Sequence, residues 1–163
     1  MHPTIDALDP TTSIFWLRIG AAVLCGGMLG LERQLRGKPA GIRTSILICI
    51  GTMYFVALGS SYASIHVDPT RVLGQVVTGI GFLGAGVILT REGLVVGVTS
   101  AAVIWVLAAI GAVIGMGYVL PAVTISGVTV MILIGVERLE ATFRSLRRGV
   151  HGRFGSGSLS SDE

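Results

Sequence analysis

Five long apolar stretches dominate this 163-residue sequence and leave few folds open to it. They cover residues 14–31, 44–62, 72–89, 98–117 and 118–136, and none of them contains Asp or Glu. A helix that crosses the hydrocarbon core of a bilayer needs about 20 mainly apolar residues. Only 13% of the residues are charged, against roughly 25% in soluble domains. The sequence therefore predicts an all-α, polytopic membrane bundle of about five transmembrane helices.

The fourth and fifth stretches adjoin with no charged residue between them. Gly115, Gly117 and Pro121 are the turn signals in this region. One unbroken helix over both stretches would be about 60 Å long, which is about twice the hydrocarbon thickness. We therefore expect a tight turn and two separate helices.

The basic residues predict the orientation of the bundle. If five spans alternate, ten of the twelve Lys and Arg residues fall on one side: Arg33, Arg36, Lys38, Arg43, Arg91, Arg138, Arg144, Arg147, Arg148 and Arg153. By the positive-inside rule this side is the cytoplasm, so the N-terminus is predicted outside and the C-terminus inside. Arg71 marks the outer end. Arg18 lies near the outer end of the first span, where we expect it to snorkel to the headgroups, with a functional or dimer-pairing role as the alternative.

Three segments flank the five-helix domain of residues 14–136. Residues 1–13 lack the basic start of a secretory signal and are predicted to be an external tail. Residues 137–150 are predicted to form an amphipathic juxtamembrane helix, either an interfacial anchor or a packing contact, because apolar residues recur there at spacings of three and four. Residues 151–163 have no apolar face to bury and are expected to be disordered.

Glycines form three patterns. Residues 79–86, with Gly79, Gly81, Gly84 and Gly86, contain the G-x-G-x-x-G pattern of dinucleotide-binding proteins, but that motif needs a strand before it and a helix after it in a soluble unit. Inside an apolar span, the run indicates either close helix packing or a bent or broken helix that lines a polar cavity. Two GxxxG pairs, Gly26 with Gly30 and Gly111 with Gly115, are predicted to pack helices closely.

Charged and hydroxyl side chains are predicted to meet at the cytoplasmic ends of the spans. Segment 32–43 places one carboxylate among four basic residues, and its glycines and proline are expected to hold these charges near one another. The topology brings the start of the fourth span and the Gly84–Gly86 end of the third span to the same depth. We call the resulting set the rim: Glu32, Arg33, Arg43, Thr44, Thr99 and Ser100. The alternative is a solvated loop that only sets the topology.

The residue chemistry limits the activities that we expect. Mg²⁺ is usually held by one or two carboxylates together with retained waters, and Glu32 is the candidate metal ligand. No acidic residue lies inside a span, and this weakens the hypothesis that the protein transports Mg²⁺ directly. The sequence contains no Ser-His-Asp set, HExxH or Walker motif. We expect no enzyme, no resident cofactor apart from possible Mg²⁺, and no nucleic-acid partner.

Three ordered blocks, GLERQLRGKPAGIRT, RVLGQVVTGIGFLGAGVIL and GVTSAAVIWVLAAIGAVIGMG, closely resemble the membrane domain of the bacterial MgtC/SapB family. The resemblance implies an inner-membrane protein associated with growth under magnesium limitation and, in pathogens, with virulence. Longer members carry a soluble domain after the last span, which we do not expect in the 27 residues after Val136. By position, the family pattern falls on Glu32, Arg33, Gly41, Arg43, Thr44, Arg71, Gly79, Gly81, Gly84, Gly86, Thr99, Ala101, Ala102 and Trp105.

Two residues depart from the family pattern. Ser45 stands where the family often has His, and Ser100 stands where a second Thr is usual. Two functions follow as hypotheses. The first is a membrane regulator, a homodimer through its glycine faces, that docks on another membrane protein or senses an ion at the rim. The second is a transporter or channel for Mg²⁺ or another small ion that uses the rim and the glycine run.

Overall fold

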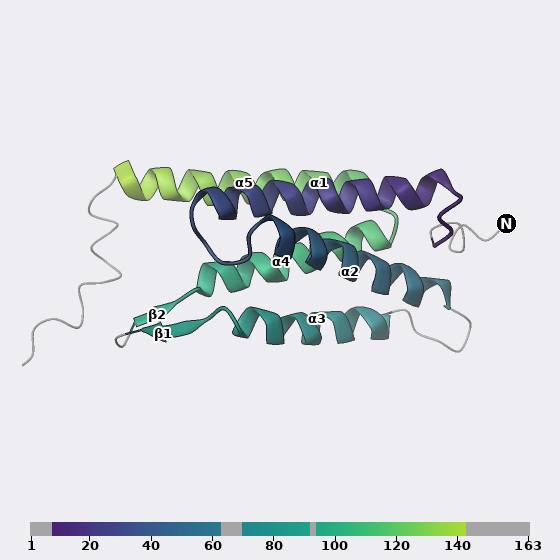
Figure 1. The fold of residues 1–163 in the computed structure, drawn as a ribbon, viewed down its shortest axis with the longest axis horizontal. Helices are drawn as coiled ribbons and strands as arrows, with labels where there is room; N and C mark the ends of the chain where they lie inside the picture. The colour runs from purple at the N-terminus through teal and green to yellow at the C-terminus, as the bar shows by residue number, and fades with distance from the viewer. Residues whose placement is uncertain (1–7, 63–69, 92–93, 143–163) are drawn as a thin grey trace, which may run out of the picture. The chain divides into compact units, whose positions relative to one another are not determined.

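The computed structural model describes residues 8–62, 70–91 and 94–142. These residues form five helices and one hairpin (Figure 1): α1 (Ser13–Leu35), α2 (Ile42–Ser61), α3 (Thr70–Ala85), β1 (Leu89–Arg91), β2 (Leu94–Val96), α4 (Val98–Gly115) and α5 (Val119–Thr142). Helices α1, α2, α4 and α5 are long and apolar enough to cross a membrane. The prediction of a polytopic helical membrane protein is therefore confirmed.

The third apolar stretch does not remain helical to its end, as the predicted span 72–89 required. Helix α3 ends at Ala85, where the N–H groups of Gly86 and Val87 donate to the carbonyls of Phe82 and Gly84 at 3.1 and 3.2 Å. The chain then enters the antiparallel hairpin, in which Leu89 lies opposite Val96. Strands of three residues are too short to produce a periodic pattern in the sequence, so the hairpin was not predicted.

A tight turn separates α4 from α5, as we expected. Helix α4 ends at Gly115 and α5 begins at Val119. Gly117 has a φ of 97°, a left-handed conformation that favours glycine. The N–H groups of Gly117 and Tyr118 donate to the carbonyls of Ile114 and Val113 at 2.9 and 3.0 Å, and these bonds satisfy carbonyls at the end of α4.

The chain divides into two compact units, Met1–Thr129 and Val130–Glu163. The first contains α1 to α4, the hairpin and the first part of α5. The second contains the rest of α5, which runs without interruption past Val136 to Thr142. The predicted juxtamembrane helix 137–150 is therefore, as far as residue 142, a continuation of α5. The remainder of that segment, the predicted tail 151–163 and most of the predicted tail 1–13 lie outside the described residues.

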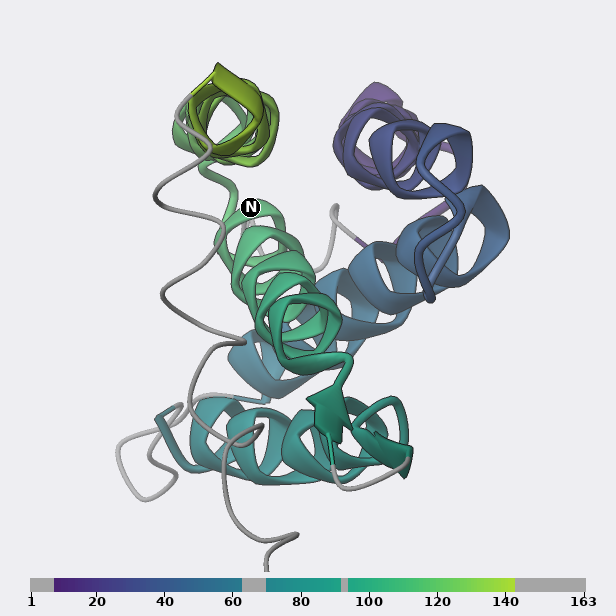
Figure 2. The same cartoon turned by 90° about the vertical axis from the view of Figure 1, so that its left-hand side faces the viewer.

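Helix α2 is the central helix of the first unit (Figure 2). On one side it contacts Gly26 and Gly30 of α1, and a Cβ added to Gly30 would lie 2.6 Å from the Cα of Ile42. On another side it contacts Gly111 and Gly115 of α4, where an added Cβ would lie 2.6 Å from the carbonyl oxygens of Cys49 and Met53. The predicted close packing at both GxxxG pairs is confirmed.

Hydrogen bonds fix the residues at the start of α1. The side chain of Asp9 accepts hydrogen bonds from the backbone N–H and the hydroxyl of Thr11 at 2.9 and 2.7 Å, and these bonds lower the pKa of the Asp9 carboxyl. The exposed indole of Trp16 donates to the carbonyl of Pro10 at 2.9 Å. An exposed indole with a polar contact suits the membrane interface.

Candidate functional site

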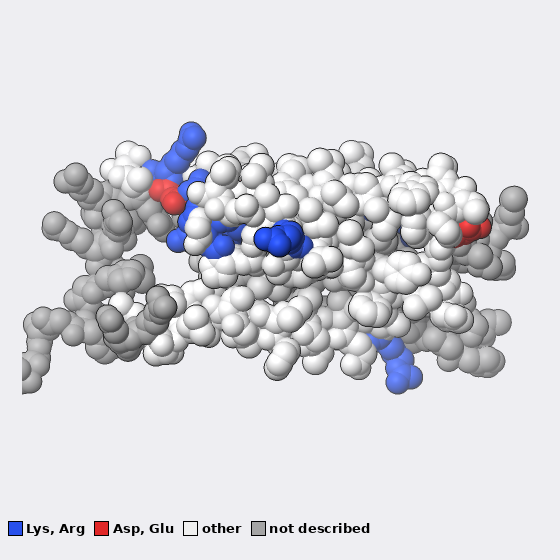
Figure 3. All heavy atoms as spheres, in the orientation of Figure 1, with Lys and Arg blue, Asp and Glu red and all other residues white. Residues whose placement is uncertain are grey.

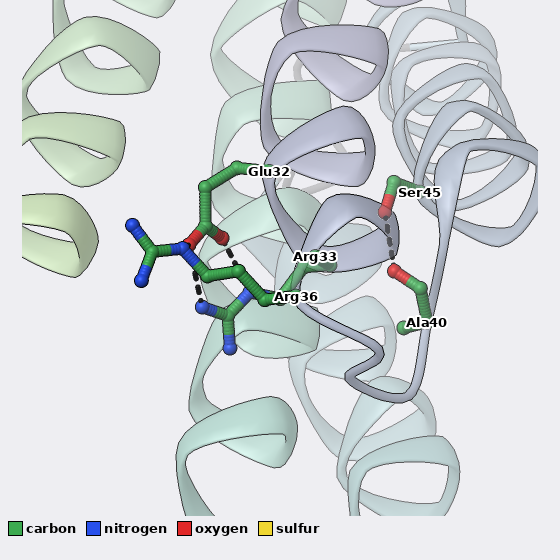
Figure 4. Close-up of polar contacts among 5 residues, drawn as sticks. All are labelled: Glu32, Arg33, Arg36, Ala40 and Ser45. Atoms are coloured by element: carbon green, nitrogen blue, oxygen red, sulfur yellow. Dashed lines mark hydrogen bonds and ion pairs between the residues drawn. The ribbon is translucent and has the colours of Figure 1, made fainter. Parts of the chain in front are cut away.

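The rim centres on an ion cluster in the last turns of α1 (Figure 4). Arg33 binds Glu32 through two contacts, Nε to Oε2 at 2.6 Å and Nη2 to Oε1 at 2.9 Å. Arg36 adds a contact from its Nε to Oε1 of Glu32 at 2.7 Å. Glu32 and Arg33 are both buried. The predicted ion pairing is confirmed, but these residues lie on or next to a helix, because α1 continues four residues beyond the predicted span.

The cluster leaves Glu32 poorly suited to bind a metal ion. Both carboxylate oxygens already accept hydrogen bonds from guanidinium groups, and one carboxylate with two guanidinium groups has a net charge of +1. A divalent cation would have to displace a cation from each oxygen. Among the described residues, no group of three or more His, Cys, Asp and Glu side chains is placed to hold a metal.

The other predicted rim residues lie at the same end of the first unit but do not join the cluster. Figure 1 shows that α1 and α3 end where α2 and α4 begin. Arg43 and Thr44 are exposed on the first turn of α2, and Arg43 forms no ion pair with any residue that the structure describes. On the first turn of α4, Thr99 is exposed and Ser100 is buried. The rim is therefore an ion cluster around the buried Glu32 and Arg33, beside separate side chains of which Ser100 is buried and the others are exposed.

Ser45 has a structural role that the sequence analysis did not identify. Its hydroxyl donates to the carbonyl of Ala40 at 3.0 Å and is fully buried (Figure 4). A Cβ on Gly30 would lie 2.9 Å from the Cβ of Ser45, so glycine is needed at position 30 beside Ser45. The nearby GxxxG pair was the only signal in the sequence that could have predicted this role.

The glycine run of α3 divides into free and packed positions. Helix α3 continues through Gly79, Gly81 and Gly84 and ends at Ala85, so the chain leaves the helix near the end of the run and not in its middle. A Cβ at Gly79 or Gly81 would meet nothing within 4 Å, whereas at Gly84 it would lie 3.7 Å from Ala101 of α4. Gly86 follows the end of the helix. Gly84 therefore makes an ordinary contact with α4, whereas Gly79 and Gly81 have open space beside them within the described chain.

A groove of about 610 Å³ lies between α2 and α3 and reaches Gly79. Its polar lining residues are Thr44, Thr52 and Gln75, while the other nine are apolar residues or glycine. A second, apolar groove of about 260 Å³ lies between α3 and α4 and includes the exposed Trp105. No acidic residue lines either groove, so neither provides the charged lining expected of a cation pathway.

Two further arginines lie away from the rim. Arg71 is exposed on the first turn of α3. Arg18 is half-buried, and its guanidinium donates from Nη1 to the carbonyl of Gly115 at 2.9 Å, at the C-terminus of α4. Arg18 thus binds a helix end within its own chain, which the snorkelling interpretation did not anticipate.

Figure 3 shows that most of one face of the molecule carries no charge.

Known bacterial proteins are similar to this chain over most of its length. The MgtC family model matches residues 19–142. Over 147 residues the chain is 42% identical to the Escherichia coli (strain K12) protein named "Putative magnesium transporter YhiD", covering 86% of this chain and 67% of that protein. It is 42% identical over 135 residues to Protein MgtC of Brucella abortus (strain 2308), covering 80% and 56%, and 36% identical over 138 residues to Protein SapB of Bacillus subtilis (strain 168), covering 80% and 58%. The chain thus spans between about half and two thirds of the length of these relatives. No solved structure matches it.

Proposed function

Because the chain belongs to the MgtC family, we propose that it supports magnesium homeostasis and low-magnesium growth as a regulator in the bacterial inner membrane. In this proposal the protein acts by docking on another membrane protein. One of the relatives named above carries magnesium in its name. That name also raises the alternative, a transporter of Mg²⁺ or another small ion.

One observation favours a regulator over a transporter. The only carboxylate among the rim residues, Glu32, has both oxygens bound by arginine side chains. A site for Mg²⁺ needs free oxygen ligands in an octahedral arrangement. The apolar groove beside Gly79 supports the same choice, because its lining provides three polar side chains and no charge.

The exposed rim residues are the surface that we assign to docking. Arg43 and Thr44 on α2 and Thr99 on α4 lie at the same end of the first unit, and each is exposed. Arg43 is exposed and forms no ion pair with any other residue that the structure describes, so it is available to an acidic group on a partner. The buried Glu32 cluster then has a supporting role, since it fixes the end of α1 beside this surface.

Docking is tested by growth rescue. Arg43→Ala is expected to abolish rescue of a deletion strain in low-magnesium medium while leaving the melting temperature of the purified protein unchanged, because Arg43 is exposed. Lys38→Ala, an exposed basic residue in the neighbouring loop, is the matched control and is expected to keep rescue. Full rescue by Arg43→Ala, Thr44→Ala and Thr99→Ala alike would exclude this docking surface.

Transport is tested with purified protein in liposomes that contain a magnesium-sensitive dye. We expect no Mg²⁺ flux above that of protein-free liposomes. A flux that is lost in Gly84→Leu but kept in Gly84→Ala would favour the transporter, because an added Cβ at Gly84 makes only an ordinary contact with Ala101.

The regulator is also proposed to be a homodimer. Two of the predicted glycine faces, on α1 and α4, are used within the chain, whereas Gly74, Gly79 and Gly81 of α3 have open space beside them. A dimer through glycines would therefore use α3. Light scattering of the protein in detergent is expected to give the mass of two chains, and Gly81→Leu is expected to reduce it to one.

A further inference from the structure

The β1–β2 hairpin exposes aliphatic side chains that nothing in the described chain covers. Ile88, Leu89, Leu94, Val95 and Val96 are between 39% and 60% exposed. Within the described residues, the two strands make their main contacts with each other. Exposed apolar residues that lie side by side in this way mark an interaction surface.

The length of α1 indicates where the hairpin lies relative to the bilayer. The exposed apolar residues of α1 begin at Ile14 and end at Leu35, which is 77% exposed. At 1.5 Å per residue this length is about 32 Å, close to the hydrocarbon thickness of about 30 Å. Figure 1 shows the hairpin at the end of the bundle where α1 ends, beyond the end of α3 and the start of α4. This is the level at which acyl chains give way to headgroups.

The unpaired backbone groups of the hairpin also place it at the boundary between acyl chains and headgroups. The sheet has two strands, so each strand has an outer edge that no other strand in the sheet pairs with. Unpaired N–H and C=O groups are excluded from the hydrocarbon core but are satisfied by water among the headgroups. The aliphatic side chains, in contrast, are favoured by contact with acyl chains. Both requirements are met only at the boundary between the two regions.

The junction with α4 holds the hairpin in a defined direction. Gly97, between β2 and α4, has a φ of 94°. A Cβ at this position would collide with the carbonyl of Val87. The backbone on the two sides of the hairpin is therefore in close contact at its base, and only glycine is accommodated there.

We propose that the β1–β2 hairpin is an interfacial anchor whose aliphatic side chains contact lipid at the boundary between headgroups and acyl chains. Its partner is the lipid leaflet on the rim side of the protein. This assignment holds whether the protein acts as a regulator or as a transporter.

The test is depth-dependent quenching of a fluorophore on the hairpin. Val95→Cys is labelled with an NBD maleimide and reconstituted into vesicles of phosphatidylcholine and phosphatidylglycerol. The native Cys25 and Cys49 are fully buried, so labelling is directed to the introduced thiol. Lys38→Cys, in an exposed loop, is the water-facing control, and Phe55→Cys, exposed within α2, is the control inside the membrane.

We expect lipid carrying a nitroxide near its headgroup to quench NBD at position 95, and iodide to quench it at least about threefold more weakly than at position 38, because an interfacial segment lies partly within the acyl boundary. Iodide quenching equal to that at position 38 overturns the proposal, since the hairpin would then lie in water. Quenching by neither reagent also overturns it, since protein would then cover the hairpin. Leu89→Cys repeats the measurement if Val95→Cys does not yield folded protein, as judged by helicity and gel filtration.

Discussion

The glycines of this bundle are of two kinds, which differ in what an added Cβ atom would contact. At Gly26, Gly30, Gly111 and Gly115 it would lie closer than 3.0 Å to backbone atoms of α2, so these residues set the distance between helices. At Gly79 and Gly81 it would meet nothing. All of these residues belong to spaced glycine motifs, so the sequence alone does not distinguish them.

The close approach at Gly26 can be measured against its neighbour. Gly26→Ala is expected to destabilise the bundle by about 1 to 3 kcal/mol, the usual cost of overpacking, because its Cβ would lie 2.8 Å from the Cα of Ile46. Gly27→Ala is the control, since its Cβ would approach Ile46 only to 3.9 Å. Thermal unfolding in detergent measures both changes, and equal melting temperatures for the two variants would contradict the packing described here.

The buried charges of the rim predict a second effect at the residue scale. Glu32→Gln removes the carboxylate that neutralises the buried guanidinium of Arg33. Breaking a buried pair by removing one partner costs about 3 to 5 kcal/mol, so we expect a large drop in the melting temperature. Lys38→Gln removes an exposed charge nearby and is expected to cause little change. If both variants melt like the wild type, Glu32 does not stabilise the end of α1.

Among the elements, α1 and the C-terminus of α4 are joined by one charged hydrogen bond. Arg18→Met keeps much of the aliphatic length of the side chain and removes the donor to the Gly115 carbonyl. Hydrogen bonds to charged groups contribute about 1.5 to 3 kcal/mol, and a cation at a helix C-terminus is favoured by the helix dipole. Arg18→Met is therefore expected to lower the unfolding free energy by about this amount, whereas Leu17→Met, at an exposed neighbour, leaves it unchanged. Chemical denaturation in detergent compares the two.

The number of helices followed from the sequence, but some of their ends did not. Apolar length predicted five helical segments, and Gly117 marked the turn between the last two. Helix α1 extends to Leu35 and includes the ion-paired Glu32 and Arg33, so charged residues continue a helix where their presence suggested a loop. Helix α3 stops early because the chain turns into a hairpin, whose pairing depends on contacts between residues on both sides of a turn.

For the molecule as a whole, the predicted topology puts Lys38 and Asp68 on opposite sides of the membrane. With single cysteines at Lys38 and Asp68, a membrane-impermeant maleimide added to intact cells is expected to label position 68 and not position 38, because the basic rim is predicted to face the cytoplasm. The buried Cys25 and Cys49 should not react, and wild-type protein measures that background. Labelling of both introduced cysteines from the same side would contradict the topology.

The sequence predicted which helix ends form the rim, but it did not predict which rim side chains pair. Alternating spans correctly brought the ends of α1 and α3 together with the starts of α2 and α4. Residue spacing did not reveal that Glu32 pairs with Arg33 and Arg36 while Arg43 has no ion-pair partner in the described part of the chain. Pairing depends on which side of each helix faces the neighbouring helices. For the same reason, the hydrogen bond from Arg18 to Gly115, 97 residues away, had no signal in the sequence.

The position of α2 between α1 and α4 has a consequence for biosynthesis. The ribosome delivers α1 and α2 in succession, so the contact at Gly26 and Gly30 is available as soon as both helices are inserted. Gly111 and Gly115 of α4 contact another surface of α2, formed by Cys49, Thr52, Met53 and Val56. This contact forms only later, because α4 is synthesised after α3 and the hairpin. A nascent chain that stalls before α4 therefore leaves this surface of α2 without its partner helix.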